Sequence, residues 1–153
     1  MSKILEAKEE LKRADHLLYV SLKYTRTVDV IKSIIDRLIA SIDLSMDFLL
    51  EIAKEKKRLK EEIPTNVGLK AELLQRVYED PRLAEMIVFF ITLRKINRAE
   101  YKRSNEFRRH VTMTAITESG IILINLDVIK EYYERTVDYV KYSDELINPK
   151  KEH

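Results

Sequence analysis

Cationic side chains concentrate in one stretch of the chain, residues 94–110, which we call the basic segment. Its lysines and arginines are Arg94, Lys95, Arg98, Lys102, Arg103, Arg108 and Arg109, and its acidic residues are Glu100 and Glu106. Cations of this kind bind phosphate groups, and Asn97, Tyr101 and Phe107 add hydrogen-bonding and stacking groups, a combination that suits single-stranded or irregular RNA. Our first hypothesis is therefore a non-catalytic binding module that contacts RNA or another anionic partner through the seven cations and Tyr101.

A second interpretation of the same residues is structural. Cations are favoured at the C-terminal end of a helix by the helix dipole, and Glu100 and Glu106 can neutralise some of the arginines. In a helix, Lys95, Arg98 and Lys102 are neighbours along one face, at spacings of three and four residues, which favours the first hypothesis instead.

Six residues separate Arg103 from His110. This spacing resembles the Arg-x(4–6)-His signature of HEPN domains, which are small and often dimeric helical bundles. In catalytic members of that superfamily the arginine and the histidine cut RNA without a metal. The resemblance implies a metal-independent ribonuclease, in which Arg103 stabilises a phosphate and His110 is the general acid or base.

A third hypothesis is a structural subunit that is held to itself or to a protein partner. It rests on an expected β-hairpin and on a group of tyrosines near the C-terminus, Tyr132, Tyr133, Tyr139 and Tyr142. At helical spacing such tyrosines favour packing in a core or an interface.

Composition excludes several other classes of function. The chain has no cysteine, which rules out disulfides, thiolate metal sites and thiol nucleophiles. Gly68 and Gly120 stand alone, so there is no glycine-rich phosphate loop, and no histidine–carboxylate pattern predicts a metal. The longest apolar run, residues 86–91, is far shorter than the roughly 20 residues of a membrane span. We expect a cytoplasmic protein with no cofactor, no metal and no membrane partner.

Hydrophobic spacing predicts the elements that would position these residues. The first 63 residues contain neither proline nor glycine and carry apolar residues three and four apart, which predicts two long helices with a turn at residues 25–29. Thr27 or Asp29 is expected to cap the second of these helices, Thr65 or Asn66 a short third one, and Asp80-Pro81 a fourth. The fourth helix is expected to end at residues 104–105.

After the basic segment, two β-branched runs flank a turn that contains Gly120, which predicts a β-hairpin at about residues 110–126. Asp127 is expected to cap a last helix that ends before Pro149. The predicted fold is therefore mainly α, an antiparallel helical bundle with one β-hairpin before the last helix. We expect one domain over residues 1–147 and a frayed tail over 148–153.

Three short segments also resemble those of small archaeal proteins without an assigned role. They are Ala-Asp-His-Leu at residues 14–17, Ser-x-Glu-Phe at residues 104–107 and Ile-Lys-Glu-Tyr at residues 129–132. This likeness supports the order of elements and implies no activity.

Overall fold

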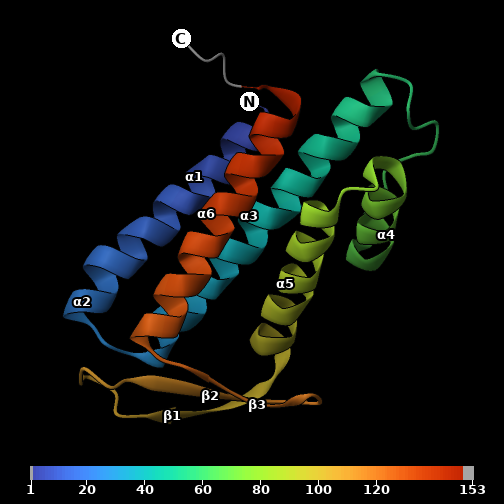
Figure 1. The fold of residues 1–153 in the computed structure, drawn as a ribbon. Coiled ribbons are helices and arrows are strands. Elements are labelled where there is room, and N and C mark those ends of the chain that lie inside the picture. Colours follow the sequence, from blue (N-terminus) through green and yellow to red (C-terminus); the bar gives the residue numbers. More distant parts are fainter. Residues whose placement is uncertain (1, 150–153) are drawn as a thin grey trace.

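A computed structural model describes residues 2–149 and has a mainly helical fold with a small sheet at one end (Figure 1). In chain order the elements are α1 (Lys3–His16), the π-helical turn η1 (Leu17–Ser21), α2 (Leu22–Tyr24), α3 (Val28–Glu55), α4 (Val67–Tyr78), α5 (Pro81–Arg98), β1 (Glu100–Ser104), β2 (Thr112–Thr117), β3 (Gly120–Ile124) and α6 (Leu126–Ile147). The predicted fold class is confirmed.

Side-chain caps fix where most of the helices begin. Thr27 accepts a hydrogen bond from the Val30 N–H, Asn66 accepts one from the Leu69 N–H, and Asp80 accepts one from each of the Arg82 and Leu83 N–H groups. Each cap satisfies amides that have no partner inside the helix. These three predicted caps are confirmed.

The last helix begins differently from the prediction. Asn125 accepts the hydrogen bond from the Val128 N–H and is the cap, whereas Asp127 lies in the first turn. The prediction of Asp127 as the cap is wrong because the hairpin ends at Ile124, two residues earlier than expected. An acidic side chain in the first turn remains favourable to the helix dipole. Of the predicted tail, residues 150–153 lie outside the described residues.

Helix α3 forms the centre of the bundle, with α1 and α6 on one side and α4 and α5 on the other (Figure 1). Its fully buried residues include Ile31, Ile35, Leu38, Ile42, Met46 and Leu49, the apolar stripe that the spacing predicts. Three tyrosines of α6 make contacts within the chain: the Tyr133 hydroxyl donates to Asp15, the Tyr142 hydroxyl donates to Asp80, and Tyr139 is buried.

No helix among residues 2–149 is long and apolar enough to cross a membrane.

The sheet closes the end of the bundle where α3 begins (Figure 1). Strands β2 and β3 form the predicted hairpin, with Thr117 opposite Gly120, whose φ of 123° lies in the region that glycine tolerates best. Strand β1 adds to β2 in antiparallel register, from Glu100 opposite Ile116 to Ser104 opposite Thr112. This third strand replaces the final turns predicted for the fourth helix, which ends at Arg98.

Candidate nucleic-acid interface

The sheet divides the basic segment into three parts. Arg94, Lys95 and Arg98 lie in the last turns of α5, Lys102 and Arg103 lie on β1, and Arg108 and Arg109 lie with His110 in the loop between β1 and β2. The expectation that Lys95, Arg98 and Lys102 share one helical face is therefore wrong. The chain becomes extended at Ala99, and from Glu100 on, pairing with β2 satisfies the backbone groups that a longer helix would have satisfied internally.

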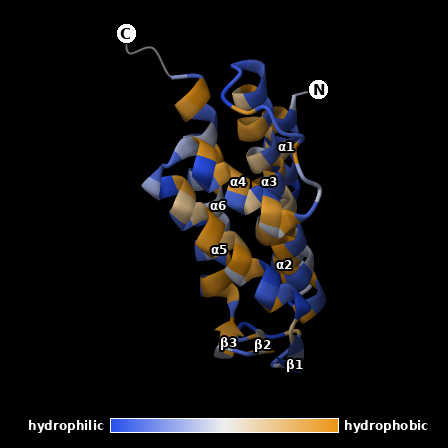
Figure 2. Cartoon of the chain, turned by 90° about the vertical axis from the view of Figure 1, so that its right-hand side faces the viewer, coloured by the Kyte–Doolittle hydropathy of each residue, from blue (hydrophilic) through white to orange (hydrophobic). Residues whose placement is uncertain are grey.

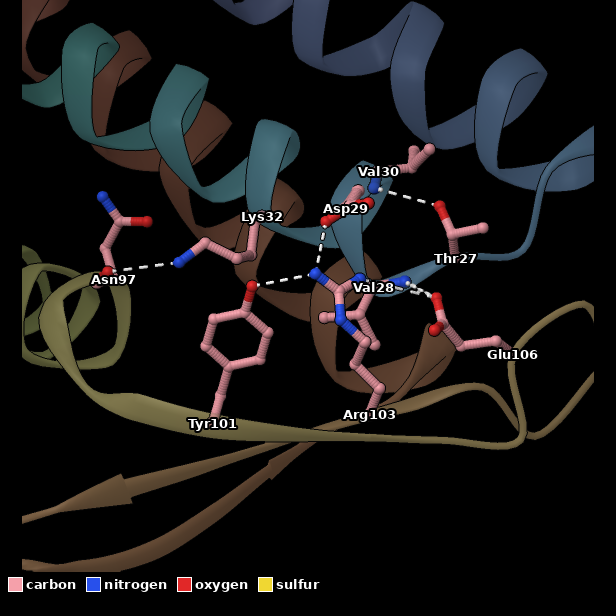
Figure 3. Close-up of polar contacts among 9 residues, drawn as sticks. All are labelled: Thr27, Val28, Asp29, Val30, Lys32, Asn97, Tyr101, Arg103 and Glu106. Atoms are coloured by element: carbon pink, nitrogen blue, oxygen red, sulfur yellow. Dashed lines mark hydrogen bonds and ion pairs between the residues drawn. The ribbon is translucent and has the colours of Figure 1, made fainter.

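Arg103 and Tyr101 face the bundle and attach the sheet to α3 (Figure 3). Arg103 Nη2 donates to Asp29 Oδ1 over 2.8 Å and to the Tyr101 hydroxyl over 3.0 Å, and Lys32 Nζ lies 4.5 Å from the centre of the Tyr101 ring. Arg94 is half-buried and lies over the Phe90 ring. These three members of the predicted binding set are therefore engaged within the chain.

The contact between Arg103 and Asp29 also changes how both groups titrate. The hydrogen bond from Arg103 lowers the pKa of Asp29, and the same bond raises the pKa of Arg103. Because the folded-state pKa of Asp29 is depressed, the contact is complete above the ordinary carboxyl pKa of about 4 and is lost as the pH falls through the lower folded-state value. Arg103 is thus held in place at neutral pH.

The remaining cations face solvent. They are Lys95, Arg98, Lys102, Arg108 and Arg109, and within residues 2–149 no carboxylate forms an ion pair with any of them. Lys95 and Arg98 line a groove of about 250 Å³ beside the β2–β3 turn, which Glu118 also lines. Lys102 projects from the opposite face of the sheet to Arg103, because successive side chains alternate along a strand.

The loop that carries Arg108 and Arg109 is fastened to the start of α3. The Glu106 carboxylate accepts a hydrogen bond from the Val28 N–H over 3.1 Å, and the Phe107 N–H donates to the Arg26 carbonyl over 2.7 Å. Figure 3 shows Glu106 reaching from the loop to the first residues of α3. The backbone of this loop is consequently fixed by contacts with residues about 80 positions earlier in the chain, at the start of α3.

These contacts hold Phe107 in an unfavourable backbone conformation with its ring in solvent. Its φ is 65°, in the left-handed region that bulky residues avoid, and the residue is 77% exposed. An exposed aromatic ring gains nothing from burial, and a left-handed non-glycine backbone costs about 1 kcal/mol or more.

Glycine at position 107 should relieve this strain. Phe107→Gly and Phe107→Ala both remove the ring, yet glycine adopts a positive φ without steric penalty. We expect the glycine variant to be more stable than the alanine variant by about 1 kcal/mol. Urea unfolding followed by circular dichroism measures the difference, and an alanine variant as stable as the glycine variant would show that the backbone at Phe107 is not strained.

His110 and Arg103 have different neighbours. His110 lines a cavity of about 270 Å³ with Arg109, Asn125 and Asp127, whereas the Arg103 guanidinium is occupied by Asp29. Among the described residues, no hydrogen bond or ion pair joins Arg103 to His110, and no cluster of three or more histidine or carboxylate side chains could hold a metal ion.

The predicted binding set omits Phe107, although the first hypothesis names it as a stacking group, and it omits Glu106, which holds the loop. Asn105, which is also left-handed with a φ of 53°, is a residue type that tolerates this conformation and so gave a signal for a tight loop. Nothing local marks Phe107 as strained, because its conformation depends on Arg26 and Val28.

Comparisons with protein-family models, with curated proteins and with solved structures gave no match for this chain.

Proposed function

We propose that this chain is a non-catalytic module that binds single-stranded RNA through the loop at residues 105–110. The observation that carries the proposal is Phe107, whose ring stands in solvent on a strained backbone that hydrogen bonds hold in place. An exposed aromatic ring on a fixed backbone is a stacking surface for an unpaired base, and every base has a face that can stack on it.

The charges around Phe107 complete such a site. Arg108 and Arg109 follow it directly, are exposed and have no ion-pair partner among the described residues. A base stacked on Phe107 would place the adjoining phosphates near these guanidinium groups, which bind phosphate oxygens in a bidentate manner. Single strands suit this arrangement better than a duplex, because their bases are free to leave the stack.

The proposal is non-catalytic because the arginine that a HEPN-like ribonuclease would need is engaged elsewhere. Arg103 is bonded to Asp29 and Tyr101, and its contacts hold the sheet on α3. Cleavage by Arg103 and His110 remains the rival hypothesis. Measuring the length of the RNA after incubation tests it, because cleavage shortens the RNA.

The test is fluorescence anisotropy with a pool of short labelled single-stranded RNAs at several salt concentrations. Phe107→Ala should weaken binding about tenfold without changing the salt dependence, because stacking releases no counterions. Arg108→Glu with Arg109→Glu should weaken binding and reduce the slope of log K against log salt by about 1.4, from two lost phosphate contacts on a single strand.

The matched control makes the same charge change at the other end of α3. Lys56 and Lys60 are exposed, and Lys56→Glu with Lys60→Glu should leave affinity and slope near those of the wild type. Equal losses in the control and in the arginine variant would mean diffuse attraction and would refute a site at the loop. RNA shortened in metal-free buffer, and left intact by His110→Ala, would instead establish the ribonuclease.

A further inference from the structure

The outer face of the sheet, which we define as Glu100, Lys102, Thr114, Ile116, Ile121 and Leu123, points away from the bundle. Its orientation follows from the register, because these residues alternate with Tyr101, Met113, Ala115, Ile122 and Ile124, which pack toward the helices. A sheet that packs on a core with one face normally presents polar residues on the other. Here Ile121 is 68% exposed, Leu123 57% and Ile116 41%.

The strand at the edge of this face lacks the usual protection against pairing. Strand β3 has no charged residue and no proline between Gly120 and Ile124, whereas the opposite edge, β1, carries Glu100, Lys102 and Arg103. Charged residues on edge strands discourage association, and an apolar edge favours it. The apolar part of the outer face is therefore next to the unprotected edge.

The register arranges these six residues in two rows that complement each other, beside a third row of Ser104 and Thr112 that carries no charge. One row reads Glu100, Ile116, Ile121 across the three strands, and the neighbouring row reads Lys102, Thr114, Leu123. A two-fold axis in the plane of contact and perpendicular to the strands exchanges the rows. Glu100 of one copy then lies opposite Lys102 of the second copy, and Ile121 lies opposite Leu123 of the second copy, each contact occurring twice.

We infer that the outer face binds a second copy of this chain, sheet on sheet, to form a two-sheet sandwich. Glu100 and Lys102 lie opposite each other only when the rows are exchanged. The strands of the second copy therefore run antiparallel to those of the first copy. Packed sheets lie about 10 Å apart with their strands within about 30° of each other, so the two bundles extend in opposite directions.

The size of the face sets the strength of this dimer. Three strands about 4.8 Å apart and about five residues long cover an area of roughly 15 by 16 Å. That footprint is small beside the roughly 800 Å² per partner of a standard interface, so the inferred dimer is weak and reversible. The inference is independent of RNA binding, since Phe107, Arg108 and Arg109 are not part of the face.

A competing apolar surface supplies the matched control. Val88 is 63% exposed on α5, beside a groove that Phe89, Tyr132 and Tyr139 line, and Figure 2 shows hydrophobic residues along this helix. Its exposure resembles that of Ile121 and Leu123, so Val88→Lys adds the same charge to an equally accessible apolar position.

The experiment is sedimentation equilibrium of the intact chain from about 1 µM to about 500 µM, without RNA. The wild type should dimerise, and Leu123→Lys should weaken the dimer about a hundredfold. The two-fold axis makes the contact between Leu123 and Ile121 occur twice, so the substitution removes both copies of it. Glu100→Lys and Lys102→Glu should each weaken it about tenfold, and the variant with both changes should recover affinity close to that of the wild type.

Each remaining outcome decides against the inference. A wild type that stays monomeric over the whole range overturns it, and so does a charge-exchanged variant that associates no better than its single variants. A dimer lost with Val88→Lys but kept with Leu123→Lys would assign self-association to the α5 groove instead. Circular dichroism of each variant confirms that the fold is kept, which the exposure of all these positions leads us to expect.

Discussion

Replacing Asp43 and Asp47 together by asparagine should lower the free energy of unfolding by about 3 kcal/mol, because it leaves a buried ammonium group without a counter-charge. Lys70 on α4 is 5% exposed, and its Nζ lies 2.8 Å from a carboxylate oxygen of each aspartate on α3. Asparagine keeps the shape and one acceptor oxygen, so the loss measures charge rather than packing. Urea unfolding at neutral pH gives the value.

The buried lysine also predicts a rescue. Adding Lys70→Met to the two asparagine changes removes the charge that has lost its partners and should recover most of the stability. If the triple variant is as unstable as the double one, the loss comes from the aspartates alone and not from the unpaired lysine.

The same cluster predicts how the effect depends on pH. Burial alone would lower the pKa of Lys70, but hydrogen bonds with Asp43 and Asp47 raise it above its ordinary value. A raised folded-state pKa stabilises the protein below the unfolded-state pKa of about 10, and this contribution is lost as the pH rises through the folded-state value. The difference in stability between the wild type and the double asparagine variant should therefore shrink in strongly alkaline solution, where Lys70 loses its charge.

Replacing Glu106 by alanine should affect both the fold and the proposed RNA site. The Glu106 carboxylate accepts a hydrogen bond from the N–H of the buried Val28 and lies 3.7 Å from Arg103. Its loss leaves the amide without an acceptor and should cost about 2 kcal/mol of stability, as for other hydrogen bonds to charged groups. Urea unfolding measures this cost.

The effect of Glu106→Ala on RNA binding distinguishes two explanations for that binding: stacking on the Phe107 ring, and electrostatic attraction alone. Removing a carboxylate makes the loop more positive, which by itself strengthens binding to RNA. If the proposal is right, binding should instead weaken severalfold, because Glu106 holds the backbone that presents the Phe107 ring. Tighter binding by the alanine variant would mean that charge alone attracts RNA and that the ring contributes nothing.

The sequence by itself determined the features that depend on residues close together in the chain. Thr27, Asn66 and Asp80 cap their helices by hydrogen bonds to amides two or three residues away, so the side chain and its partner are read in one short window. The apolar stripe of α3 and the hairpin around Gly120 follow equally from local spacing and from a turn that needs a positive φ.

The tertiary structure decided the features that depend on distant partners. Residues 100–104 form a strand because β2 pairs with them, although their charges fit a helix end equally well. Arg103 is engaged because Asp29, 74 residues earlier, lies beside it, while Arg108 and Arg109 meet no carboxylate among the described residues. Phe107 is strained because Arg26 and Val28 hold the loop. Packing therefore decides which of the described cations lack a carboxylate partner and which aromatic ring is exposed. Spacing along the chain does not specify what a side chain contacts across the fold.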